Sequence, residues 1–323
     1  MQEERNHLHS HRPPVLVICG PTGIGKTAAA IEIARRFNGQ IVGADAMQVY
    51  RRMQIGTAKP SVEEQSLVRH HLVDVVEPDE PFDASRYCDM ARQVVDELHA
   101  REVLPLVVGG TGLYIKALLY GVFRSAPPDP QVRRQLKAEA ARNGPRDLHR
   151  RLEDVDPDAA GRIHPNDTFR IIRALETVAA TGETITAHQD CHRFQDAPYR
   201  TFKIGLNMKR DALYERINTR VDAMLQAGFV EEVRSLLEAG YRPELKSMQS
   251  LGYRHMVAFL QDRLQWEEAV RTMKRDHRRY AKRQLTWFRS DPDIIWSEPQ
   301  QISGLFPAID AFLSIRTIRP KRL

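Results

Sequence analysis

The stretch VICGPTGIGKTAAAIEIA, residues 17–34, constrains the fold more than any other part of the chain. An apolar run leads into a glycine-bracketed turn, and a lysine, a threonine and an alanine-rich segment follow. Residues 20–27 match G-x-x-x-x-G-K-[ST] at every fixed position and stand between a predicted strand and a predicted helix, the context that supports this motif. The backbone N–H groups of such a loop, with the positive end of the helix, surround a cluster of anionic oxygens. The sequence therefore predicts a phosphate-binding loop.

The residues predicted to hold the phosphate groups form one continuous segment: Gly20, Pro21, Thr22, Gly23, Ile24, Gly25, Lys26 and Thr27. Lys26 adds a mobile positive charge, and the Thr27 hydroxyl is a predicted Mg²⁺ ligand.

Short apolar runs alternate with helical segments along the first part of the chain. Residues 15–19 are a predicted strand, and residues 40–45 and 104–110 are each predicted to form a strand followed by a polar or glycine-rich corner. Helices are predicted from Lys26 and over residues 85–100. This alternation indicates an α/β fold with a parallel sheet flanked by helices, like that of P-loop NTPases, whose active site lies at the carboxyl ends of the strands.

The sequence pattern changes at SAPPDP, residues 125–130, where three prolines in four positions stop any regular element. The sequence from residue 131 to about 182 is polar and helical with no convincing strand, and FKIGLNM (202–208) returns to strand composition. We therefore expect a small all-helical domain at 125–201, inserted into an α/β core of residues 13–124 and 202–323. Residues 1–12 are expected to form a disordered polar tail.

Composition excludes several classes of protein. No apolar run approaches the ~18 residues of a membrane helix, and the N-terminus has no signal-peptide pattern, so we expect a cytoplasmic protein without membrane contact. Three cysteines without a CxxC pair predict neither a disulfide framework nor a zinc site.

The basic residues are concentrated near the C-terminus. Residues 271–289 hold eight basic residues against one acid, enough to account for the net charge of +6. On a helix, the basic positions from 271 to 283 share one half of the circumference, with Met273, Tyr280 and Trp287 on the other. A face of one sign repels itself unless a polyanion neutralises it. The pattern favours nucleic-acid contact, although a salt-linked internal helix or a diphosphate-lining role would also fit.

Two polar residues follow predicted strands at the same sheet edge as the phosphate-binding loop. Asp45 is a candidate general base, or alternatively a turn or helix-capping residue. Thr111, after two glycines, reaches the same region or caps the next helix. The strand that ends in VVGGT carries no carboxylate at its end, which disfavours a nucleotide-hydrolysing motor.

Several longer segments resemble the tRNA dimethylallyltransferase family, also called tRNA isopentenyltransferases. Besides GPTGIGKT, they are DAMQVYRRMQIGTAKP (45–60), VGGTGLYIKALLYG (108–121), RIHPNDTFRIIRALE (162–176), LYERINTRVDAML (213–225), QSLGYR (249–254) and AKRQLTWFR (281–289). The resemblance covers nearly the whole chain from Val15 and is to the compact bacterial type.

The resemblance implies transfer of a dimethylallyl group from its diphosphate to N6 of the adenine 3′ to the anticodon of tRNA. It implies that Asp45 is the base, that Thr111 contacts the reacting groups, and that Arg220, the loop and Mg²⁺ neutralise the leaving diphosphate. It also implies a set of tRNA-contacting residues: Asp45, Ala46, Met47, Gln48, Arg133, Phe169, Arg170, Ile171, Ile172, Arg173, Gln249, Ser250, Leu251, Gly252, Tyr253 and Arg254.

Four residues of the basic helix are added as phosphate contacts: Arg278, Arg279, Lys282 and Arg283. Family members commonly carry serine after the aspartate, where this chain has Ala46. The protein is expected to act as a monomer. Three alternatives stay open: a P-loop kinase for a small metabolite, an adenylate isopentenyltransferase acting on free AMP, and a non-enzymatic RNA-binding module.

Overall fold

The computed structural model describes residues 12–122, 129–192 and 197–315. The expected N-terminal tail, residues 1–12, lies almost entirely outside the described residues, as does most of the proline-rich stretch at 125–130. The chain divides into two compact units, one of residues up to Leu119 together with Pro198 onward, and the other of Tyr120–Ala197. The boundaries that we predicted, 125 and 201, fall a few residues later in the chain.

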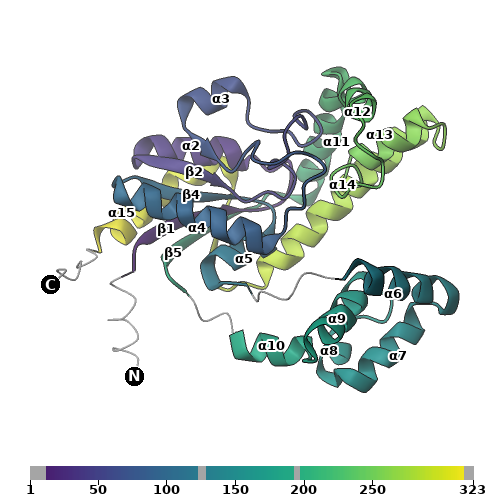
Figure 1. Cartoon of the computed structure of the whole chain (residues 1–323). Coiled ribbons are helices and arrows are strands. Elements are labelled where there is room, and N and C mark those ends of the chain that lie inside the picture. Colours follow the sequence, from purple (N-terminus) through teal and green to yellow (C-terminus); the bar gives the residue numbers. More distant parts are fainter. Residues whose placement is uncertain (1–11, 123–128, 193–196, 316–323) are drawn as a thin grey trace. The chain divides into compact units, whose positions relative to one another are not determined.

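The first unit is built on a sheet whose strands all pair in parallel (Figure 1). In the described part of the chain the strand order is β3-β2-β4-β1-β5-β6. The strands are β1 (Pro14–Cys19), β2 (Gly39–Gly43), β3 (His70–His71), β4 (Leu104–Gly109), β5 (Arg200–Leu206) and β6 (Ile294–Ser297). This confirms the predicted α/β class.

Helices cover the sheet and continue beyond it in the C-terminal part of the same unit. They are α2 (Lys26–Arg36), α3 (Val62–Leu67), α4 (Ala84–Ala100), α5 (Gly112–Tyr120), α11 (Arg210–Gln226), α12 (Phe229–Glu238), α13 (Tyr253–Leu260), α14 (Trp266–Arg289), η1 (Pro299–Leu305) and α15 (Phe306–Ser314). No helix among the described residues is both long enough and apolar enough to cross a membrane.

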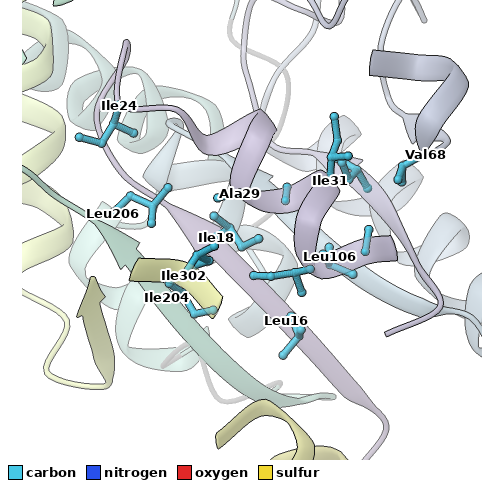
Figure 2. Close-up of a cluster of buried hydrophobic side chains, with 14 of the residues drawn as sticks. Leu16, Ile18, Ile24, Ala29, Ile31, Val68, Leu106, Ile204, Leu206 and Ile302 are labelled. Carbon is cyan, nitrogen blue, oxygen red and sulfur yellow. The ribbon is translucent and has the colours of Figure 1, made fainter. Parts of the chain in front are cut away.

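Alternate residues of the central strands enter different cores. Leu16, Ile18 and Leu106 pack with Ala29, Ile31 and Ile33 of α2 and with Ile302 and Ile309 (Figure 2). Val15 and Val17 point to the other face, because successive side chains of a strand alternate. The helix α4 is tied to α5, since the Cys88 thiol donates to the Ala117 carbonyl. Burial on both faces explains why these strands read as continuous apolar runs.

The second unit is all-helical in its described residues. It contains α6 (Pro130–Asn143), α7 (Pro145–Val155), α8 (Pro157–Arg162), α9 (Thr168–Thr181) and α10 (Ile185–His192). Three of these helices begin with proline, which suits the first helical position because its missing N–H would have no helical partner there. A small core of Leu136, Leu148, Leu152, Ile171 and Leu175 holds them together.

An ion pair with a buried carboxylate and a partly exposed guanidinium lies within this helical unit. The Arg133 guanidinium donates in bidentate fashion to the carboxylate of Glu176, with an Nη2–Oε2 distance of 2.7 Å, and the Glu176 side chain is only 1% exposed. Arg173 lies 3.7 Å from the same carboxylate. The predicted tRNA contact Arg133 therefore also joins α6 to α9.

Replacing this acid tests its structural role. Glu176→Ala removes the acceptor of the Arg133 guanidinium, and because Arg133 is 37% exposed and can be rehydrated, we expect a loss of about 1–3 kcal/mol of local stability. Hydrogen exchange of residues 130–181 in the full-length protein measures the loss. Glu139→Ala, which breaks the more exposed Glu139–Arg151 pair, is the matched control with an expected cost of at most about 1 kcal/mol. Equal protection in both variants would contradict a special role for Glu176.

Candidate active site

The predicted phosphate-binding loop borders a cavity of about 990 Å³ at the carboxyl ends of β1, β2 and β4. Its walls come from the loop itself, residues 45–48, residues 56–60, α11, α14 and the segment that precedes α13. All of these elements belong to the first unit. The sheet thus brings Lys26, Thr27 and Asp45 to one cavity, as the sequence predicted.

The loop has a backbone that only glycine accommodates easily. Gly20 has a φ of +148°, and a Cβ there would lie 2.8 Å from the Leu206 carbonyl oxygen; Gly25, at φ +102°, precedes α2. Within the loop, the Lys26 ammonium donates to the Pro21 carbonyl at 2.9 Å. The N-terminus of α2 and the lysine head group therefore face the same hollow.

A second cation reaches the loop from α11. Arg220 donates through Nη1 to the Thr22 hydroxyl at 3.1 Å. Burial lowers the pKa of Arg220, and Asp45 opposes this shift. Burial and then the Arg220 charge lower the pKa of Lys26 to about 8. The charge of Arg220 therefore disfavours the protonated, charged form of Lys26. Such repulsion between cations is expected of a site that binds an anion.

Arg216, one helical turn before Arg220, was not singled out by the sequence analysis. Its Nε donates to the Gly23 carbonyl at 3.1 Å. The R-x-x-x-R spacing of RINTR could have revealed it, because residues four apart lie on the same face of a helix.

Asp45 lies two residues beyond β2, which ends at Gly43, and so belongs to the polar corner that follows this strand. Its Oδ1 accepts the N–H groups of Met47 at 2.8 Å and Gln48 at 3.3 Å. The turn-capping interpretation thus holds. Among the described residues no group donates to Oδ2, so that oxygen is available to a substrate in the cavity.

Thr111 forms hydrogen bonds with the backbone on both sides of Asp45. Its hydroxyl accepts the Ala46 N–H at 3.0 Å, and its own N–H donates to the Ala44 carbonyl at 3.2 Å. Because the contact at position 46 uses the backbone, it does not depend on the serine that family members commonly carry there.

Gln284 of α14 links the two halves of the site. Its Oε1 accepts the Thr22 N–H and its Nε2 donates to the Gly110 carbonyl, both at 2.9 Å. A Cβ on Gly110 would lie 2.2 Å from this amide nitrogen, so the glycine is required for the contact. The predicted phosphate-binding loop and the turn at residues 109–111 (the GGT corner) are therefore held by one buried side chain.

Two further residues of α14 face the cavity, Tyr280 and His277. Burial and then Asp45 raise the pKa of Tyr280 to about 12. Burial and then Arg220 lower the pKa of His277 to about 3, so its imidazole stays neutral near pH 7. Tyr280 was predicted to lie opposite the basic face of the helix, but no role was predicted for it, for His277 or for Gln284. Their spacing of three and four residues was the available signal.

Gln48, one of the residues expected to contact tRNA, already has partners within the protein. Its Nε2 donates to the carbonyls of Thr57 at 3.3 Å and Ala58 at 2.9 Å. The amide is thereby oriented by the segment 56–60, while the side chain still lines the cavity. Met47 and Ala46 line it as well.

The segment 249–254 contributes to the cavity at two positions, Ser250 and Leu251. Gln249 donates to the Pro243 carbonyl at 2.7 Å, and Arg254 pairs with Asp276 of α14. Gly252 and Tyr253 are buried, whereas the two end residues, 249 and 254, are exposed. The four residues in the middle of the segment thus line the cavity wall or support it.

Some basic side chains of α14 bond to other residues of the protein, and others are exposed to solvent. Arg271 pairs with Glu268, Lys274 with Asp222, and Arg275 with Asp276, and Arg278 donates to Asn218 at 2.6 Å. Arg279, Lys282 and Arg283 are exposed. The interpretation of a salt-linked helix therefore describes its N-terminal half, and the exposed cations lie toward its C-terminal half.

In the helical unit the segment 169–173 has two sides. Ile171 and Ile172 are buried in the core, whereas the Phe169 side chain is 78% exposed. Arg170 is exposed and pairs with Asp167 at 3.1 Å. The surface of this predicted tRNA contact is therefore an exposed aromatic ring beside arginines, with the two isoleucines fixing its position from below.

The fold is that of a P-loop NTPase-like α/β protein, and a carboxylate two residues beyond a strand lies in the same cavity as the predicted phosphate-binding loop. A family model described as IPP transferase matches residues 48–291, which is more than half of the chain. The protein therefore belongs to the IPP transferase family.

Individual relatives agree. The tRNA dimethylallyltransferase of Syntrophobacter fumaroxidans is 55% identical over 296 residues, covering 92% of this chain and 86% of that protein. The crystal structure of full-length tRNA isopentenylpyrophosphate transferase from Bacillus halodurans matches with a TM-score of 0.71 at 39% identity. The match covers 94% of this chain and 97% of the Bacillus halodurans chain. The crystal structure of a eukaryotic dimethylallyltransferase acting on tRNA matches with a TM-score of 0.76 at 28% identity. The match covers 96% of this chain and 82% of the eukaryotic chain.

The two hydrogen bonds of Gln284 are expected to be needed for normal turnover. Gln284→Leu removes both bridging hydrogen bonds and leaves the Thr22 N–H and the Gly110 carbonyl without their partner. We expect the turnover number of the enzyme to fall by about 10- to 100-fold, because small displacements of reacting groups are costly. Thr286→Ala, which loses an exposed bond to the Lys282 carbonyl on the same helix, is the control. Normal turnover in Gln284→Leu would contradict the bridging role.

The lowered pKa of Lys26 predicts that diphosphate binding depends on pH. The protonated ammonium attracts a diphosphate, so affinity is full below the pKa of about 8 and falls as pH rises through it. We expect a decrease approaching about tenfold per pH unit for an unreactive alkyl diphosphate, measured by calorimetry between about pH 7 and pH 10, where the ligand's own charge is constant. Lys26→Arg keeps its charge throughout and should flatten the profile. Parallel profiles for the two proteins would rule out Lys26 titration.

Proposed function

We propose that this protein is a tRNA dimethylallyltransferase, which moves the dimethylallyl group of dimethylallyl diphosphate to N6 of the adenine 3′ to the anticodon and releases diphosphate. The observation that carries the proposal is the pair of cations, Lys26 and Arg220, on the phosphate-binding loop of an IPP transferase family member, with Asp45 beside the same cavity. We further propose that it acts as a monomer in the cytoplasm.

The donor's diphosphate occupies the loop. As the bond between the allylic carbon and the diphosphate oxygen breaks, negative charge grows on the leaving group and positive character grows on the carbon. The loop N–H groups, Lys26 and Arg220 stabilise that negative charge, and they are oriented before the reaction begins. His277 stays neutral and adds no competing charge.

Mg²⁺ fits this donor site only together with its substrate. The Thr27 hydroxyl lines the cavity, while the described residues contain no group of three or more His, Cys, Asp or Glu side chains able to hold a metal ion. Mg²⁺ often binds through few protein ligands, substrate phosphates and water. Thr27 would hold it, and the ion would neutralise diphosphate charge.

The acceptor nitrogen is a weak nucleophile, because its lone pair is delocalised into the adenine ring. Asp45 Oδ2 accepts one N6 proton as the new bond between N6 and the allylic carbon forms, and diphosphate takes the electron pair of the broken bond. The adenine has to leave the anticodon-loop stack to enter the cavity. Gln48, oriented by its bonds to residues 57 and 58, contacts the edge of the flipped base.

The rest of the tRNA is held by exposed cations and one aromatic ring. Arg279, Lys282 and Arg283 present positive charge on α14, and Phe169 with Arg170 presents a stacking surface on the helical unit. Contacts of this kind are typical of proteins that bind RNA loops and phosphates. The structural likeness to a eukaryotic dimethylallyltransferase that acts on tRNA supports tRNA as the acceptor.

A direct assay tests the proposal. Purified protein is incubated with labelled dimethylallyl diphosphate and one acceptor, either tRNA or free AMP, and separately with γ-labelled ATP and small metabolites. Label should enter only tRNA, and diphosphate should be released. Label on AMP would favour the adenylate enzyme, and phosphoryl transfer would favour a kinase; either result would overturn the proposal.

Asp45 is tested by Asp45→Asn, which keeps the turn but cannot accept the proton. We expect turnover to fall by about two to four orders of magnitude with little change in tRNA affinity. Asp262→Asn is the matched control, since this exposed residue has a φ of +54° that asparagine also adopts. If Asp45→Asn lost tRNA binding and turnover in equal proportion, Asp45 would be structural rather than the base.

A further inference from the structure

One carboxylate of α12 binds three consecutive backbone N–H groups of the segment that follows Asp45. Glu232 Oε2 accepts from Gln54 N at 2.8 Å and from Ile55 N at 2.7 Å, and Oε1 accepts from Gly56 N at 3.2 Å. The Tyr253 hydroxyl donates to Oε1 at 2.5 Å. Four donors from two different parts of the chain therefore meet on this one side chain.

The contact differs from an ordinary surface ion pair. Among the described residues, no lysine, arginine or histidine forms an ion pair with Glu232. Consecutive N–H groups that converge on an anion form a binding hollow for negative charge, and hydrogen bonds to an ionised acceptor are stronger than neutral ones. The carboxylate thus fixes a stretch of backbone that has no regular secondary structure of its own.

Close packing holds the same stretch against α12 and α13. A Cβ on Gly56 would lie 2.1 Å from the Phe229 ring and 2.6 Å from the Tyr253 ring. The two rings pack edge to face with centroids 4.9 Å apart. The backbone at Gly56 therefore has no room to move toward these helices, and Glu232 prevents it from moving away.

A short series of hydrogen bonds leads from this clamp to the proposed base. The carbonyls of Thr57 and Ala58, directly after the clamped residues, accept from Gln48 Nε2, and the Gln48 N–H donates to Asp45 Oδ1. Gly56, Thr57, Ala58 and Gln48 all line the cavity. Glu232 itself is absent from the lining of the cavity and acts through the segment it binds.

We propose that Glu232 is a positioning residue for the acceptor adenine: it anchors residues 54–56 so that Gln48 and the wall at 56–58 present a fixed edge to the base beside Asp45. This inference rests on the proposed function for its kinetic consequence. The donor's diphosphate is held by a different part of the chain, the phosphate-binding loop and Arg220, so loss of Glu232 should affect the two substrates unequally.

The kinetic test uses Glu232→Ala and Glu232→Gln in the full-length protein. We expect kcat/KM for tRNA to fall by about 10- to 100-fold in Glu232→Ala, with affinity for dimethylallyl diphosphate within about twofold of the starting protein. Glu232→Gln keeps one acceptor oxygen and should recover part of the loss. Glu231→Ala, which removes the adjacent exposed carboxylate paired with Arg234, should leave both values unchanged. Equal loss of donor affinity and tRNA kinetics would overturn the proposal, as would unchanged tRNA kinetics.

Hydrogen exchange of the unliganded proteins provides a readout that does not depend on activity. The amides of residues 54–56 should be protected in the starting protein and in Glu231→Ala. They should exchange at least about tenfold faster in Glu232→Ala, while β1, β4 and α2 keep their protection. Faster exchange throughout the first unit would show a general loss of stability and overturn the specific role. If the starting protein itself prenylates no RNA, the proposed function fails, and the exchange data still decide whether Glu232 anchors the segment.

Discussion

The site depends on two cations that the protein holds close together before any anion arrives. Lys26 and Arg220 converge on one short loop, and the charge of Arg220 is the second largest cause, after burial, of the lowered pKa of Lys26. Such an arrangement costs stability in the absence of a ligand and favours any group that brings several negative oxygens. A diphosphate that leaves is a better match than a neutral substrate, since its charge grows as the bond breaks.

A parallel sheet brings strand ends to one edge, but this alone does not fix them to the accuracy that group transfer needs. Two side chains from the C-terminal helices supply that accuracy. Gln284 ties the phosphate-binding loop to the GGT corner, and Glu232 ties the segment after Asp45 to α12 and α13. Both use polar side-chain groups bonded to backbone atoms, and both segments carry a glycine where a Cβ would collide, Gly110 and Gly56. A side chain also holds the backbone at Ala46, whose N–H donates to the Thr111 hydroxyl.

The sequence predicted those features that depend on local pattern. The phosphate-binding loop followed from a motif with fixed glycines, the buried strands from continuous apolar runs, and the helical unit from proline-bounded polar segments. The strands β3 and β6 were missed, since runs of two and four residues carry little signal. Gln284 and Glu232 were also missed. The backbone partners of Gln284 lie 174 and 262 positions away in the chain, and those of Glu232 lie 176 to 178 positions away. No local pattern records such a contact.

The basic helix shows how one element combines tasks that sequence analysis treats separately. Along α14, Met273, Ala281 and Phe288 are buried, while Tyr280 and Gln284 face the cavity. The exposed cations Arg279, Lys282 and Arg283 occupy the remaining face. Because an α-helix is a rigid rod over these few turns, a phosphate bound at Lys282 and the loop held by Gln284 keep a fixed spacing. In the proposed reaction, RNA that binds to the exposed face of α14 is therefore held at a fixed position relative to the donor site.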